Sequence, residues 1–260
     1  MHAYLLGHLP PVPIHSIAMK RIWPFVLGIF FCTVVFAAAA QANLEKFTGE
    51  ADAFLRTHVQ DGRVDYANVK KDFKKIESLY DQVGTMNLTN ASESARKAFY
   101  LNAYNLAVIY QVTKLYPLKS ALDASGFFDQ LKHRVAGEAM TLNALETDKL
   151  IKAYGDARVH FTLACAAKGC PKLASFAFRP ATLDAQLDER ARLALNSAYF
   201  IRVNKGQKKA EVSRIFDWYQ KDFTNGGRSV LAYINQYRRE KIPTQYALAY
   251  YEYDWSLNGK

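Results

Sequence analysis

The segment from Ala98 to Val112 constrains the folding of this chain more than any other. It belongs to a longer helical pattern, residues 92–117, and is apolar nearly all the way round rather than along one stripe. A helix of that kind must be covered on every side, so the pattern predicts a central, buried helix. Ser92 is a suitable N-cap and Pro117 ends the pattern.

Two asparagines lie within this apolar helix. Asn102 and Asn105 are three positions apart, so they project from one face. A buried amide without a partner costs about 1–3 kcal/mol. The pair could orient a substrate or donate to a developing oxyanion, or it could pin the backbone of a neighbouring loop. We favour the loop clamp, because a loop that covers a central helix needs its backbone groups satisfied.

Helical and strand-like patterns are mixed along the rest of the chain. The pattern around Lys205-Gly206 predicts a β-hairpin. We therefore expect an α+β fold, a single domain in which the buried central helix packs on a small mixed or antiparallel sheet. Amphipathic helices are predicted at 43–59, 70–83, 182–198 and 230–240, and strands at 159–165 and 247–258.

Residues 19–42 have the layout of a secretory signal peptide. Lys20 and Arg21 form a basic n-region, residues 23–39 an apolar core, and Ala40-Gln41-Ala42 a cleavage site. An uncleaved membrane anchor is the alternative, but the apolar run is at the lower limit for spanning a bilayer.

We expect cleavage near Ala42 and a periplasmic or secreted protein. Removing residues 1–42 from the 260 leaves 218, enough for one domain at 43–260 with a substantial core. Residues 1–18 resemble neither a targeting nor a structural segment, so we expect Met19 to be the true start.

The charge of the chain is positive but dispersed. The net charge is +10, and removal of Lys20 and Arg21 with the signal leaves +8. The basic residues are scattered over turns and polar helix faces, which indicates a solvated surface rather than a nucleic-acid site. Peripheral contact with an anionic envelope surface is compatible with this charge. We expect a monomer without a nucleic-acid partner and, in the absence of a glycine-rich phosphate loop, without a cofactor.

The segment Arg158–Pro171, RVHFTLACAAKGCP, gathers the reactive residue types. Cys165 and Cys170 could form a local disulfide, as expected in an oxidising compartment. Cys165 could instead be an active thiol, or both cysteines could bind a metal with His160, although a fourth ligand is lacking. Spacing alone favours the structural pair over the active thiol, and the metal site least.

A strand at 159–165 would separate the two reactive residues. Alternation along a strand places His160 and Cys165 on opposite faces, since they are an odd number of positions apart. A nucleophilic Cys165 would then need a base from another part of the chain.

The segment FDWYQKDF is expected to be helical. Asp217 and Asp222 are five positions apart, about 140° round a helix, so we do not expect the two carboxylates to cooperate. Trp218 and Phe223 are interpreted as core anchors.

Several ordered blocks together resemble the domain of unknown function 547 family, along nearly all of residues 43–260. In that family the cysteine at Cys165 recurs among distant members, whereas the cysteine at Cys170 is more a feature of bacterial-type members. The resemblance therefore raises the active-thiol interpretation to about the level of the structural pair. The blocks are GRVDY, AFYLNAYN, VAGEAMTLNALE, ARVHFTLACAAKGCPKL, VSRIFDWYQKDF and YDWSLN.

The same resemblance bears on the other site residues. Asn102, Asn105, Glu146 and Arg158 match the family's blocks, but Thr147 stands where many members carry a histidine. A thiol enzyme here would have to take its base from another histidine of the chain.

Two functional hypotheses follow. The first is a cysteine-dependent hydrolase or acyl-transferase. The second is a non-catalytic module that binds a small molecule, peptide or protein, with its cysteines bridged or buried. The state of Cys165 discriminates between them, because an enzyme needs this thiol free and within reach of a base. In the first hypothesis the residues with roles are Cys165 as nucleophile, His160 or His133 as base, Glu146 to orient the base, and Asn102 or Asn105 as oxyanion donor.

Overall fold

The structure, a computed structural model, describes residues 23–260. The basic n-region at Lys20 and Arg21 and the segment 1–18 lie outside the described residues. Helix α1 (Trp23–His58) contains the apolar segment of the expected signal peptide. Residues 40–260 form one compact unit. In the part of the chain that the structure describes, no helix has the length and apolar character needed to cross a membrane.

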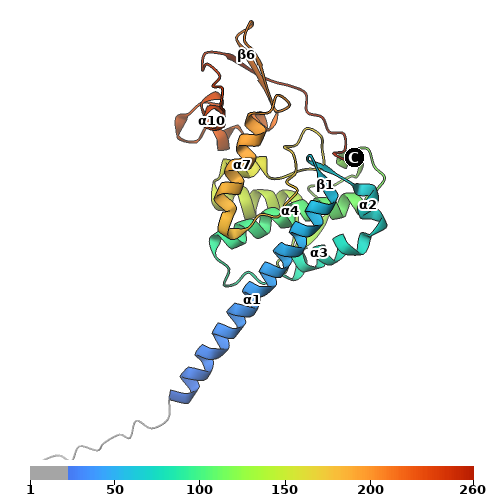
Figure 1. The fold of residues 1–260 in the computed structure, drawn as a ribbon, viewed down its shortest axis with the longest axis vertical. Coiled ribbons are helices and arrows are strands. Elements are labelled where there is room, and N and C mark those ends of the chain that lie inside the picture. Colours follow the sequence, from blue (N-terminus) through green and yellow to red (C-terminus); the bar gives the residue numbers. More distant parts are fainter. Residues whose placement is uncertain (1–22) are drawn as a thin grey trace, which may run out of the picture. The chain divides into compact units, whose positions relative to one another are not determined.

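Helix α4 (Glu93–Leu115) is the buried helix that the sequence predicts. The Ser92 side chain caps it by accepting a hydrogen bond from the Ala95 amide. Its principal neighbours are other helices: α2 (Tyr66–Lys71), α3 (Phe73–Thr85) and α5 (Leu142–Glu146), which continues into the π-helical turn η2 (Thr147–Ile151) (Figure 1).

The β-structure consists of three small sheets. Two are two-stranded antiparallel pairs, and in the third β6 pairs antiparallel with β5 and parallel with β7. The α+β class and the hairpin at Lys205-Gly206 are therefore confirmed. The strands are β1 (Val59–Gln60), β2 (Arg63–Val64), β3 (Lys132–Val135), β4 (Glu138–Thr141), β5 (Ile201–Asn204), β6 (Lys209–Val212) and β7 (Ala247–Tyr250).

The expected packing of the central helix on a sheet is replaced by helix packing. Strands of two to four residues are too short to cover a helix of 23 residues. The apolar stripes of amphipathic helices cover α4 instead.

A second hydrophobic core lies beside the one around α4. It is rich in aromatic side chains, among them Phe161, Phe216 and Phe223, whose rings lie 4.6–6.1 Å apart. Phe223 is a core residue, as predicted. The helices around this core are α7 (Leu183–Leu195), α8 (Ile215–Trp218), α9 (Gln220–Phe223) and α10 (Val230–Tyr237). Short turns complete the described chain: η1 (Ala121–Asp123), α6 (Lys152–Tyr154), η4 (Pro180–Thr182) and η5 (Asn225–Gly227).

The strand predicted at 159–165 is wrong. Residues Ala157–Phe161 form a 3₁₀ helix, η3, which the Asp156 side chain caps at the amide of Arg158. Beyond η3, the Asn105 side chain donates to the Thr162 carbonyl at 2.9 Å and accepts from the Ala164 amide at 3.0 Å. Backbone groups that would have needed a neighbouring strand are thus satisfied by a side chain.

Asp156 also anchors η3 through charge. Its carboxylate binds Arg158 at 2.9 Å and Lys97 of α4 at 2.7 Å. Burial raises the pKa of Asp156, but the hydrogen bonds from Arg158 and Lys97 outweigh burial and hold that pKa at about 2. The ionised carboxylate therefore ties η3, which carries His160, to the central helix.

The pKa of Asp156 predicts a pH-dependent contribution to stability. A carboxyl whose pKa falls to about 2 on folding stabilises the fold above its unfolded pKa, near 3.8, and loses this effect as the pH falls toward 2. We expect Asp156→Asn to lower the free energy of unfolding by about 2 kcal/mol at pH 7, and by progressively less below pH 4.

Urea unfolding as a function of pH measures this effect. Asp148→Asn is the matched control, since Asp148 pairs with Lys152 on the surface, and it should cost less than about 0.5 kcal/mol. If Asp156→Asn lowered the free energy of unfolding by the same amount at pH 7 and at pH 2.5, the lowered pKa of Asp156 would be contradicted.

Candidate functional site

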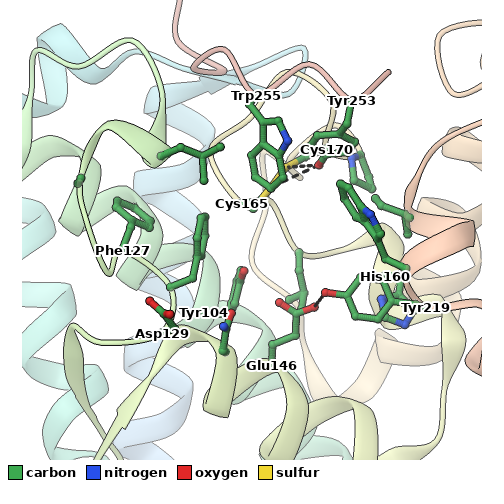
Figure 2. A pocket seen from close by; sticks show the side chains of 18 of the residues that line it. Tyr104, Phe127, Asp129, Glu146, His160, Cys165, Cys170, Tyr219, Tyr253 and Trp255 are labelled. Atoms are coloured by element: carbon green, nitrogen blue, oxygen red, sulfur yellow. Dashed lines mark hydrogen bonds between the residues drawn. A yellow bond between two sulfur atoms is a disulfide. The ribbon is translucent and has the colours of Figure 1, made fainter. Parts of the chain in front are cut away.

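A cavity of about 490 Å³ opens where the two hydrophobic cores meet (Figure 2). Its size is in the range of small-molecule sites. Six parts of the chain supply its walls: α4, the loop 122–129, α5, the segment 160–171, α8 with the residue after it, and the C-terminal segment. The lining residues include Tyr104, Leu122, Phe127, Phe128, Asp129, Glu146, His160, Leu163, Cys165, Cys170, Ile215, Trp218, Tyr219, Tyr253 and Trp255.

Glu146, at the end of α5, contributes a carboxylate to this cavity. The Tyr219 hydroxyl donates to it at 2.8 Å, as the dashed line in Figure 2 shows. Burial raises the pKa of Tyr219, and the charge of Glu146 raises it further. The same two causes hold the pKa of Tyr104 well above its usual value. Both phenols therefore stay protonated, and Tyr219 remains a hydrogen-bond donor to Glu146.

His160 lines the same cavity as Glu146, and Asp222 holds its ring in place. Its Nε2 lies 2.7 Å from Oδ2 of Asp222, and its ring packs 4.2 Å from that of Tyr219. In the neutral ring, a carboxylate at Nε2 keeps the proton there and leaves Nδ1 as the basic nitrogen. Asp217 pairs instead with Arg214. The two aspartates of FDWYQKDF thus serve different partners, and the one that binds His160 was not predicted.

Cys165 and Cys170 form a disulfide in the cavity wall. The Tyr253 hydroxyl lies 3.3 Å from Sγ of Cys165 and 3.2 Å from Sγ of Cys170. The Tyr253 ring also rests on Gly169, where a Cβ atom would come within 2.9 Å of it. The structural-pair interpretation describes this state, in which Cys165 carries no free thiol.

The C-terminal segment holds the disulfide loop in place. The amides of Lys168 and Gly169 donate to the carbonyls of Ser256 and Asp254 at 2.8 Å each. Only Ala247–Tyr250 of the predicted strand 247–258 is a strand, and the irregular continuation brings Tyr253 and Trp255 to the cavity. The chain then ends beside β1 and β2, as Figure 1 shows.

The two asparagines of α4 are loop clamps. Asn102 donates to the Phe178 carbonyl at 2.9 Å and accepts from the Phe178 amide at 2.8 Å. Asn105 holds the backbone of Thr162 and Ala164 in the same way. Neither asparagine lines the cavity. The interpretation favoured from the sequence is confirmed, and the structure does not place either amide where an oxyanion donor would be needed.

His133 lies away from the cavity. It is buried on β3, where its Nδ1 lies 2.9 Å from the Tyr80 hydroxyl. Burial lowers the pKa of His133 to about 4. Of the two histidines proposed as a base, only His160 shares the cavity with Cys165.

Three aromatic side chains form one wall of the cavity, which we call the aromatic wall: Trp218, Tyr253 and Trp255. Their ring centroids lie 4.8–5.9 Å apart. The prediction of Trp218 as a core anchor is wrong, since 49 % of this residue is exposed. FDWYQKDF is not one helix but two: α8 ends at Trp218 and α9 begins at Gln220, so the expected helical facing does not apply.

The sequence analysis missed several residues of the site. For Tyr219, Tyr253 and Trp255, the signal that could have identified them is the aromatic content of two of the quoted blocks, VSRIFDWYQKDF and YDWSLN, which lie far apart in the sequence. The missed residues are Tyr104, Tyr219, Asp222, Tyr253 and Trp255.

A metal centre finds no support in the part of the chain that the structure describes. Among residues 23–260, no group of three or more His, Cys, Asp or Glu side chains is placed to hold an ion.

The fold and the cavity define an α+β domain with a small-molecule-sized cavity between two cores. The family model described as "Protein of unknown function, DUF547" matches residues 88–193. This match supports membership of the domain of unknown function 547 family, and it confirms the resemblance seen in the sequence over residues 88–193. The match includes Glu146, His160 and both cysteines, whereas the aromatic wall lies beyond it. No curated protein and no solved structure matches the chain.

The clamp at Asn105 predicts a large loss of stability on truncation. Asn105→Ala leaves the Thr162 carbonyl and the Ala164 amide buried without partners, at about 1–3 kcal/mol for each group. We expect the free energy of unfolding in urea to fall by about 2–5 kcal/mol.

The matched control is Asn90→Ala, which removes an exposed asparagine and should change stability by less than about 0.5 kcal/mol. Equal effects of the two substitutions would show that Asn105 is not a clamp.

Proposed function

We propose that this protein binds a small molecule in the cavity between its two cores, with the Cys165–Cys170 disulfide closed. The observation that carries this proposal is the lining itself. A cavity of about 490 Å³ lined mainly by apolar and aromatic side chains presents a few polar groups, Glu146 and His160 among them, as small-molecule sites do.

The arrangement around Cys165 favours binding over catalysis. The disulfide removes the thiol that a nucleophile needs. Asn102 and Asn105 are occupied by backbone groups, and His133 lies elsewhere. A cysteine hydrolase would need a free thiol, an unoccupied oxyanion donor and a base beside the thiol, and these residues do not supply them in this state. A binding module needs none of the three.

A cysteine-dependent hydrolase or acyl-transferase is the second candidate, for the reduced protein. It is favoured by one observation: His160 and Cys165 line the same cavity, and Asp222 holds the histidine with Nδ1 as its basic nitrogen. Reduction would release the Cys165 thiol into a site that already contains a supported base.

We also propose that the protein acts outside the cytoplasm, in the periplasm or as a secreted protein. The disulfide supports this location, because disulfides persist mainly in oxidising compartments. The signal-peptide pattern of residues 19–42 supports it independently.

Filling the cavity should abolish ligand binding. Leu122→Trp places a larger side chain at the cavity lining, on a residue exposed enough to tolerate it. A fragment library of neutral, cationic and anionic compounds, screened by ligand-observed NMR, should give hits whose affinity falls at least tenfold in this variant.

The matched control is Leu193→Trp, an exposed leucine of α7 that does not line the cavity, and it should bind the same fragments as the unaltered protein. No saturable hit, or hits that Leu122→Trp does not weaken, would refute binding in this cavity.

Alkylation of the cysteines separates the two candidate functions. We expect Cys165 and Cys170 to resist iodoacetamide in the native protein until a reductant is added, because a bridged sulfur is not a nucleophile. Peptide mass spectrometry resolves both from Cys32.

After reduction, the rate of Cys165 alkylation is followed against pH, with Cys170 as the internal control. A Cys165 rate with an apparent pKa near the usual 8.5 supports the binding module. An apparent pKa well below 8.5 would favour the thiol enzyme.

A further inference from the structure

The charge inside the cavity is opposite to the charge of the chain. The sequence carries 34 Lys and Arg against 24 Asp and Glu. Yet among the described residues the cavity lining contains two carboxylates, Glu146 and Asp129, and neither a lysine nor an arginine. An anionic ligand would find neither a lysine nor an arginine in this lining, and its one histidine, His160, is already bound by Asp222, so the lining selects against anions.

The two carboxylates also lack counter-ions within the described chain. Several carboxylates elsewhere are paired, as Asp156 is with Lys97 and Glu138 with Lys149. Glu146 instead accepts a hydrogen bond from Tyr219, and neither it nor Asp129 forms a salt bridge with any residue among 23–260. Asp129 is exposed, but Glu146 is partly buried, and a partly buried carboxylate without a counter-ion is costly. A cation that entered the cavity would relieve that cost.

The aromatic wall provides a second contact for a cation. A cation over an aromatic face gains about 0.5–2 kcal/mol, and enclosures of this kind bind ammonium ligands. Elsewhere in the molecule the protein's own cations occupy such faces, as Arg202 does over Tyr251 at 4.1 Å. At the aromatic wall the described chain places none of its own.

We propose that the ligand of this cavity is an organic cation, an ammonium compound with an apolar body. The ammonium group pairs with the Glu146 carboxylate, and the apolar body packs against the aromatic wall. This inference rests on the proposed ligand-binding function and names the chemical class of its ligand.

A series of similar size that differs in charge tests the proposal. The probes are 2-phenylethylammonium, 2-phenylethanol and 3-phenylpropionate. Trp218 and Trp255 both line the cavity, so their fluorescence reports occupancy in the full chain once the third tryptophan is removed by Trp23→Phe. We expect the ammonium compound to bind at least tenfold more tightly than the alcohol, and the carboxylate most weakly.

Substitution of Glu146 tests whether its carboxylate causes the preference for the ammonium compound. In Glu146→Gln the preference for the ammonium compound over the alcohol should fall to less than threefold, because the ammonium group loses its charged partner. Glu138→Gln is the matched control, since it removes an exposed carboxylate outside the cavity and should keep the full preference. Thermal unfolding of each variant shows that the fold is retained.

The outcomes distinguish a failure of the cation assignment from a failure of the proposed ligand binding. If the alcohol or the carboxylate binds as tightly as the ammonium compound, or if Glu146→Gln keeps the preference, the cation assignment is overturned and ligand binding stands. If none of the three probes binds and the fragment screen also gives no hit sensitive to Leu122→Trp, both proposals are overturned.

Discussion

The burial of α4 on all sides is the constraint on which the rest of the structure depends. A helix covered everywhere cannot leave a polar side chain unpaired, so its two asparagines must find partners in the segments that cover it. Asn102 takes the backbone of Phe178, and Asn105 takes that of Thr162 and Ala164. The second of these clamps fixes the loop between His160 and Cys165. The hydrogen bonds that the buried Asn105 requires therefore also position the site.

The cavity exists because a second core is joined to the first across this loop. The C-terminal segment binds the disulfide loop through the amides of Lys168 and Gly169 and brings Tyr253 against both sulfurs. Opposite it, Tyr219 donates to Glu146, a contact between α5, beside the first core, and the turn after α8, beside the second. The family match ends at residue 193, so it includes Glu146, His160 and both cysteines, whereas the aromatic wall lies beyond the matched segment.

The sequence predicted what local pattern controls and missed what distant contacts control. The capped central helix, the hairpin and the burial of Phe223 follow from periodicity and turn residues close together in the chain. The irregular backbone at 162–164 does not, because the side chain that satisfies it in place of a neighbouring strand, Asn105, comes from 57 positions away. The same holds for the candidate site: His160 and Asp222 are 62 positions apart, and Glu146 and Tyr219 are 73 apart.

A positively charged protein with a negatively charged cavity is not a contradiction, because the two charges act over different distances. Scattered surface lysines and arginines produce a field that physiological salt screens within about 8 Å. A carboxylate in a partly enclosed aromatic cavity is screened far less and interacts with a bound group at contact distance. The composition of the whole chain therefore says little about what the cavity binds. In our proposal Glu146, which a tyrosine hydroxyl holds in place and which has no lysine or arginine beside it in the cavity lining, determines the selectivity.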